Sequence, residues 1–232
     1  MSTHTEPMRS PALDALIQDA GGAALPDHTP DEPHFAELMA ECAALLDGIS
    51  FVRTSDKLVA LASWTASGPK ITYDPAFSPE DPNTEDAPFR TACILHEIMH
   101  VSVDNLYEPH PDPAERKHWR SFNFHYTSSA GKDFEKQCGT ASANLTKIQD
   151  CAEADPTLDP ALRAHINGRI EYGLSSSHTH YDTILLDLLV YLRIKGHTSK
   201  NTFFAYLTKL SQQARTHRLD PQRGPVPVAP KT

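Results

Sequence analysis

The residues best suited to chemistry form one short motif, His-Glu-Ile-Met-His, at positions 96 to 100. Residues four apart share one face of an α-helix, so the imidazoles of His96 and His100 can reach a single metal ion. Glu97 lies beside them and can act as a general base toward a water on that metal. Apolar residues flank the motif, where polar side chains are unfavourable unless something satisfies them. The pattern predicts a metal-dependent hydrolytic site.

Zinc is the metal that we expect, because imidazole suits Zn²⁺ and a catalytic zinc lowers the pKa of its water to about 7. Such a site takes three protein ligands, so one more residue is needed. Residues 175 to 182, Ser-Ser-Ser-His-Thr-His-Tyr-Asp, open an apolar helix and place His178 and Asp182 one turn apart. We predict His178 as the third ligand. Asp182 is the second choice, as the ligand itself or as the carboxylate that orients a histidine.

Tyr181, in the same segment, is predicted to point its hydroxyl toward the oxyanion that forms during hydrolysis. Other candidates for the third ligand are glutamates on the regions that follow the motif. They are Glu135, Glu153 and Glu171.

The motif, with its uncharged inner and flanking positions, resembles the zinc-binding helix of the zincin metallopeptidases. Residues 70 to 75, Lys-Ile-Thr-Tyr-Asp-Pro, are reminiscent of the strand and turn before that helix in compact bacterial effector peptidases and clostridial neurotoxin light chains. The resemblance implies peptide-bond hydrolysis by zinc-activated water, with the two histidines as ligands and the glutamate as base. It also implies a sheet whose edge strand holds the substrate backbone, a role that we expect for residues 71 to 73. The metzincin subgroup is not matched, because Val103 and Leu106 occupy the positions of its glycine and third histidine.

The length of 232 residues suits one domain, which we place at residues 34 to 220. A flexible, polar, proline-rich leader is expected at 1 to 33, with room for a short helix at 12 to 20, and a proline-rich disordered tail at 221 to 232. Helices are predicted at 35–46, 89–104, 161–172, 177–194 and 201–218, and more weakly at 131–150. Strands are predicted at 49–52, 58–64, 70–73 and 121–126. The expected fold class is α+β: a small, mainly antiparallel sheet packed on the zinc-binding helix, with a helical C-terminal half.

A formal net charge of −9 and the lack of a basic stripe argue against a nucleic-acid partner. No apolar run approaches the ~20 residues that span a bilayer, and no signal sequence is recognisable. A cytoplasmic protein is the default, with export by a specialised secretion system as the alternative. The cysteines lack a Cys-x-x-Cys pair and are expected to be free thiols. They are Cys42, Cys93, Cys138 and Cys151.

The predicted function is zinc-dependent hydrolysis of a protein or peptide substrate, as in a secreted effector or toxin. One alternative is a non-catalytic interaction module in which the motif helix is only structural. Another is a zinc hydrolase that acts on a non-protein amide, because the motif specifies water activation and not the substrate. The sequence specifies neither a cleavage site nor an oligomeric state.

Overall fold

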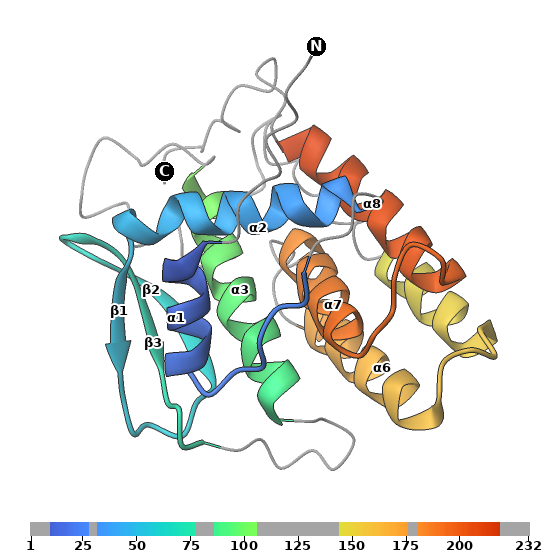
Figure 1. Cartoon of the computed structure of the whole chain (residues 1–232), viewed down its shortest axis with the longest axis horizontal. Coiled ribbons are helices and arrows are strands. Elements are labelled where there is room, and N and C mark those ends of the chain that lie inside the picture. The colour runs from blue at the N-terminus through green and yellow to red at the C-terminus, as the bar shows by residue number, and fades with distance from the viewer. Residues whose placement is uncertain (1–9, 28–31, 78–85, 106–143, 176–180, 219–232) are drawn as a thin grey trace, which may run out of the picture.

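A small sheet and a group of helices form an α+β fold in the computed structural model, as the sequence predicts (Figure 1). The structure describes residues 10–27, 32–77, 86–105, 144–175 and 181–218. The helices are α1 (Pro11–Asp19), α2 (Pro33–Leu45), α3 (Asp86–Asn105), α6 (Pro160–Ser175), α7 (Tyr181–Ile194) and α8 (Thr202–Arg218), with a short 3₁₀ turn at Leu46–Gly48. The strands are β1 (Ser50–Arg53), β2 (Ala60–Thr65) and β3 (Gly68–Tyr73).

The predicted elements in the described regions are confirmed, with small shifts at their ends. Of the weak helix predicted at 131–150, the part that can be compared is helical and runs over residues 144–154. The strand predicted at 121–126, the start of the helix predicted at 177, and the C-terminal tail lie outside the described residues.

The sheet is mixed and not mainly antiparallel, which corrects the prediction. Its strand order is β1-β3-β2, with β1 parallel to β3 and β2 antiparallel to β3. A two-residue turn closes the β2–β3 hairpin at Thr65 and Gly68, and the positive φ of 118° at Gly68 suits glycine. After β1 the chain crosses to the far side of the sheet and forms β2, which runs in the opposite direction. The hairpin then returns the chain as β3 between the two, so β3 is parallel to β1.

The inner face of the sheet packs toward α3, and its outer face is exposed. Ile71 and Tyr73 point inward and are buried, whereas Val52 and Leu61 on the outer face are 38% and 53% exposed. Helix α3 lies between the sheet and α7, packed against β2 on one side and α7 on the other (Figure 1). The motif helix is therefore the central element of the fold.

Residues 10–27 belong to the packed fold, which corrects the expected flexible leader. The Ser10 side chain accepts a hydrogen bond from the Leu13 amide at the start of α1, and Pro11 occupies the first turn, where proline is tolerated. Leu13 and Ile17, one turn apart, are both buried in the core. The segment that follows α1 is then held against α3, because the Thr91 hydroxyl donates to the Ala23 carbonyl at 2.7 Å.

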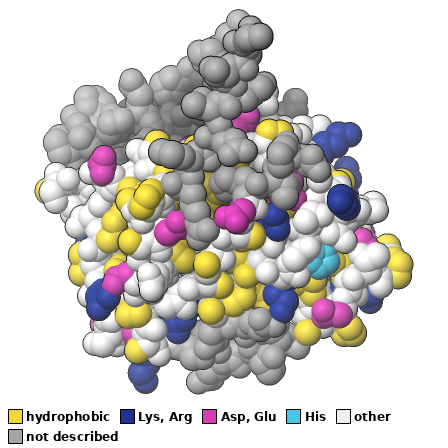
Figure 2. Space-filling view, viewed as in Figure 1, with side chains coloured by type: hydrophobic (Ala, Val, Ile, Leu, Met, Phe, Trp, Pro, Cys, Tyr) yellow, Lys and Arg dark blue, Asp and Glu magenta, His cyan; other side chains and the backbone are white. Residues whose placement is uncertain are grey.

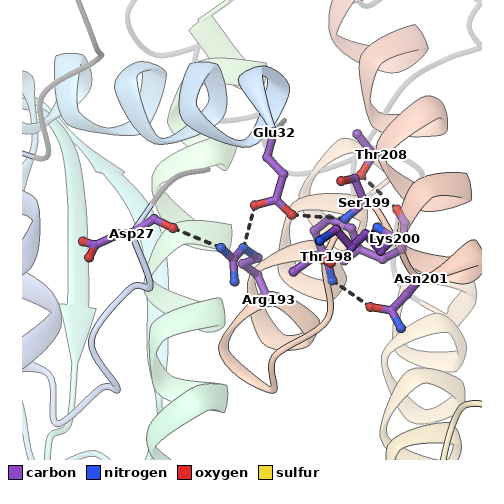
Figure 3. A network of polar contacts seen from close by, with 9 residues as sticks. Asp27, Glu32, Arg193, Thr198, Ser199, Lys200, Asn201 and Thr208 are labelled. Atoms are coloured by element: carbon purple, nitrogen blue, oxygen red, sulfur yellow. Dashed lines mark hydrogen bonds and ion pairs between the residues drawn. The ribbon is translucent and has the colours of Figure 1, made fainter. Parts of the chain in front are cut away.

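A buried ion pair ties the segment before α2 to the end of α7 (Figure 3). Arg193 Nε donates to Glu32 Oε2 at 2.8 Å, and the same guanidinium donates to the Asp27 carbonyl at 3.0 Å. The other Glu32 oxygen accepts from the Ser199 amide at 3.2 Å. Three contacts from distant parts of the chain thus satisfy two buried charges.

Charged groups are spread over the molecular surface that Figure 2 shows, where Lys and Arg side chains are scattered and form no stripe. In the described part of the chain, no helix is long and apolar enough to cross a membrane. Cys42, Cys93 and Cys151 form no disulfide with one another, and the first two are buried while Cys151 is exposed; Cys138 lies outside the described residues.

Candidate metal centre

The His-Glu-x-x-His residues lie on the C-terminal half of α3. The apolar side chains of this helix are almost fully buried, among them Ile94, Leu95 and Ile98. Arg90, two turns before the motif, donates to the Asp74 carbonyl at 2.9 Å, directly after the end of β3. Packing on both sides and this anchor hold the polar motif residues in fixed positions.

The two imidazoles converge, as their spacing on a helix predicts. Nε2 of His96 and Nε2 of His100 lie 3.2 Å apart, and the rings meet at 68°. One ligand atom from each histidine and one from Glu97 all lie within 4.8 Å of one another. In a tetrahedral zinc site with Zn–N bonds of about 2.0 to 2.1 Å, two ligand nitrogens stand about 3.3 Å apart. The positions and chemistry of both nitrogens therefore fit one zinc ion.

Behind His96 lies Asp187, a residue that the sequence did not single out. It comes from the middle of α7 and is 0% exposed, and its Oδ2 is 3.5 Å from Nδ1 of His96. Arg169 of α6 donates to the same oxygen from Nε at 2.7 Å and also from its NH2 group. Burial alone would raise the pKa of Asp187, but Arg169 and His96 outweigh it and hold the pKa at about 2. A carboxylate thus faces the ring nitrogen of His96 that points away from His100, the arrangement that orients histidine ligands.

Arg169 and Tyr172, one turn apart on α6, form a wall beside the motif. The guanidinium carbon of Arg169 lies 5.3 Å from the ring centre of Phe89 and 4.9 Å from that of Tyr172. The Tyr172 ring is 6.4 Å from that of His96, and the residue is 44% exposed. Burial and the nearby Glu97 carboxylate raise the pKa of Tyr172, so its hydroxyl keeps its proton at neutral pH. Tyr172 is therefore a hydrogen-bond donor at the edge of the candidate metal centre.

Glu97 is held by the sheet. Its Oε2 accepts a hydrogen bond from the Ala62 amide of β2 at 2.6 Å. Burial raises the pKa of Glu97, while His96 and the Ala62 amide oppose that rise. A carboxyl group with a raised pKa, next to two converging imidazoles, is suited to taking up and returning a proton.

Among the described residues, no other carboxylate, histidine or cysteine joins His96, Glu97 and His100 in the cluster. Asp182 lies on α7 five residues before Asp187, and the helical turn places it on a different face. Glu153 and Glu171 are exposed on the helices over 144–154 and α6. The structure therefore does not support these three as the third ligand. His178 and Glu135 lie outside the described residues.

Tyr181 is hydrogen-bonded to a residue outside the motif helix. A side-chain hydrogen bond joins it to Asn144, and burial is the first cause of a pKa raised to about 12. The prediction assumed that the helix at 177–194 buries one stripe of side chains. Instead, α7 is buried on all sides along Thr183–Arg193, so helical spacing could not tell which side chains face the motif. The available signal was Asp187 itself, a charged residue between leucines in the most apolar helix.

The edge strand nearest to the motif is β2, which corrects the assignment of residues 71 to 73. Those residues belong to β3, the central strand, whose two sides are occupied by β1 and β2. On its other side β2 pairs with no described strand, and β2 is the strand with most contacts to α3. A polypeptide that adds to the sheet next to the motif can therefore pair only with β2 among the described strands.

Comparison with known proteins gives no relative: no family model, curated protein or solved structure matches the chain.

Proposed function

We propose that the protein is a zinc-dependent metallopeptidase with a zincin-like arrangement of helix and edge strand. The observation that carries the proposal is the convergence of His96 and His100 on one point, with Glu97 beside it and Asp187 behind His96. A helix that needed these residues only for packing would not require the Asp187 oxygen that Arg169 holds to face Nδ1 of His96 as well, which is the placement that orients a metal-binding histidine.

His96 and His100 would hold the zinc through their Nε2 atoms. Zinc, when bound, supplies a Lewis acid and makes a water molecule acidic enough to attack a carbonyl at neutral pH. Asp187, whose Oδ2 lies 3.5 Å from Nδ1 of His96, is placed to favour the tautomer with the proton on Nδ1, which leaves Nε2 free to bind the metal. The identity of a third ligand is left to experiment, with His178 as our first candidate.

Glu97 takes the proton from the attacking water and returns it to the nitrogen of the scissile bond as that bond breaks. The products are a carboxylic acid and an amine, the acid then passes its proton to the amine to give a carboxylate and an ammonium group, and the carboxyl group of Glu97 ends in its starting state. Tyr172 donates from its hydroxyl to the oxygen on which negative charge develops, a role that the sequence had suggested for Tyr181. The guanidinium of Arg169 holds the Tyr172 ring in place.

The open side of β2 is the place where the substrate backbone would lie. Added in the manner of a further strand, a peptide would pass Glu97 at the level of Ala62. This arrangement favours an extended protein segment over a small amide, since backbone pairing requires several peptide groups in a row.

The decisive experiment compares the metal content of the parent protein with that of the variants His96→Ala, His100→Ala and Glu97→Gln. We expect about one zinc per chain in the parent and in Glu97→Gln, and a loss of zinc in both histidine variants. His197→Ala, which changes a partly buried histidine after α7, is the matched control and should keep its zinc. Glu97→Gln should lose nearly all cleavage of denatured casein.

A parent protein without zinc after incubation with it would refute the metal site and favour the interaction-module alternative. Retained zinc together with casein cleavage by Glu97→Gln at the parental rate would refute the role of Glu97.

A further inference from the structure

Glu97 receives a hydrogen bond from an element far away in the sequence. The Ala62 nitrogen that donates to it lies 35 residues earlier and 2.6 Å from Oε2. A bond from an amide to a carboxylate is charge-assisted and stronger than one between neutral groups. Because β2 packs directly on α3, the position of the sheet determines the position of this carboxylate.

The Ala62 amide points away from the sheet. Thr65 and Gly68 close a two-residue hairpin turn and form a hydrogen-bonded pair, and such pairs alternate along an antiparallel ladder. Ala62, opposite Ile71, therefore falls at a position whose amide faces the open side of β2, as does Ala60 opposite Tyr73. Edge amides of this kind usually bond to water or to an added strand. At Ala62 the carboxylate of Glu97 occupies that place.

We propose that the Ala62 amide is the positioning group for Glu97, an inference that rests on the proposed peptidase function. It holds Oε2 against β2 while the carboxylate keeps an oxygen within 4.8 Å of a ring nitrogen of each histidine. Fixing one oxygen removes rotamers that would take the carboxylate out of reach of the reacting water. The same bond also fixes the register between the base and any peptide bound along β2.

The contact can be tested without activity by measuring amide hydrogen exchange in the full-length, zinc-incubated protein labelled with ¹⁵N-alanine. Ala60 is the matched control, because its amide leaves the same strand on the same side. We expect the Ala62 amide to exchange at least roughly ten times more slowly than that of Ala60 in the parent, as a charge-assisted bond implies. In Glu97→Ala this difference should disappear. Equal exchange in the parent, or a difference that survives Glu97→Ala, would overturn the proposal.

Two proline variants test the consequence for catalysis. Proline is tolerated on an edge strand where the amide points outward, so Ala62→Pro removes the donor and alters no side chain of the metal centre. We expect Ala62→Pro to keep its zinc and to lose roughly tenfold or more in kcat on denatured casein, the scale of a misplaced catalytic group. Ala60→Pro removes the neighbouring outward amide of the same strand and leaves the bond to Glu97 in place, so its kcat should fall much less than that of Ala62→Pro. An equal fall in kcat for both variants would contradict the proposal.

The two proposals fail in different ways. A parent that binds no zinc refutes the peptidase function, whereas the exchange rates of Ala60 and Ala62 still report whether the amide holds Glu97. A parent with zinc and casein cleavage but with fast exchange at Ala62 keeps the peptidase function and refutes the positioning role.

Discussion

Replacing Asp187 with asparagine tests how the buried carboxylate supports the proposed metal centre. The change keeps the size of the side chain and removes its charge, so both partners of Asp187 are affected. His96 loses the acceptor that fixes its ring, and Arg169 keeps a positive charge that is 14% exposed at its side chain and has lost its counter-ion. We therefore expect weaker zinc binding and a less stable metal-free protein.

The stability term follows from the pKa of Asp187, which is lowered from 3.8 to about 2 in the fold. At 1.36 kcal/mol per pKa unit, this difference contributes about 2 kcal/mol to the free energy of unfolding at neutral pH. Breaking a buried ion pair from one side costs more, about 3 to 5 kcal/mol, because the remaining charge stays buried. Loss of a carboxylate that orients a metal ligand weakens metal binding about 10- to 100-fold.

The contribution of Asp187 to the free energy of unfolding depends on pH. Because the pKa of Asp187 is lower in the folded state, its contribution is fully present above about pH 4 and is lost as the pH falls toward 2. The gap in unfolding free energy between the metal-free parent and Asp187→Asn should therefore narrow over that range.

Two measurements check the expectation: urea unfolding of the metal-free proteins at pH 7 and pH 3, and zinc affinity by competition with a chelator. Asp182→Asn is the control, because Asp182 lies on the same helix outside the cluster. Its zinc affinity should match that of the parent. Parental zinc affinity in Asp187→Asn, with reduced affinity in Asp182→Asn, would refute the assignment of the orienting carboxylate.

Two further substitutions test the wall of the site and the packing of the chain. Tyr172→Phe should keep zinc and lower kcat on casein about a hundredfold, as expected when one donor to a developing oxyanion is removed. Tyr181→Phe should cleave at the parental rate, and the opposite pattern would return the role to Tyr181. Glu32→Gln should lower the free energy of unfolding by about 3 kcal/mol, since it leaves Arg193 without its buried counter-ion. Glu37→Gln, at an exposed glutamate of α2, should change it by about 0 to 1 kcal/mol in urea unfolding, and equal losses in the two variants would contradict this account.

Local spacing was enough to predict most of the helices and strands. Apolar residues at intervals of three and four gave α2, α6 and α8, and short β-prone runs between turn residues gave the three strands. The sequence did not predict how those strands pair. The path of the chain across the sheet decides which strand is central, and that path is not encoded in the spacing of any one segment. The β3 segment was therefore favoured for the substrate strand, although β3 is the central strand of the described sheet and β2 is an edge strand.

The packing of residues 10–27 also escaped the sequence. Prolines and polar residues in this region are typical of a leader, and Leu13 and Ile17 alone form too short an apolar pattern to predict a packed helix. Their burial depends on surfaces that α2 and α3 provide, and those surfaces exist only in the folded chain.

The sequence by itself determined that His96, Glu97 and His100 share one side of one helix, because the α-helix repeat is a local property of the backbone. Tertiary structure alone decided which groups complete their surroundings. Asp187 reaches His96 from α7, Arg169 and Tyr172 stand beside it from α6, and Ala62 holds Glu97 from the sheet. These contacts join residues far apart in the chain, and their existence depends on how α3 packs between β2 and α7, which no spacing within one segment encodes.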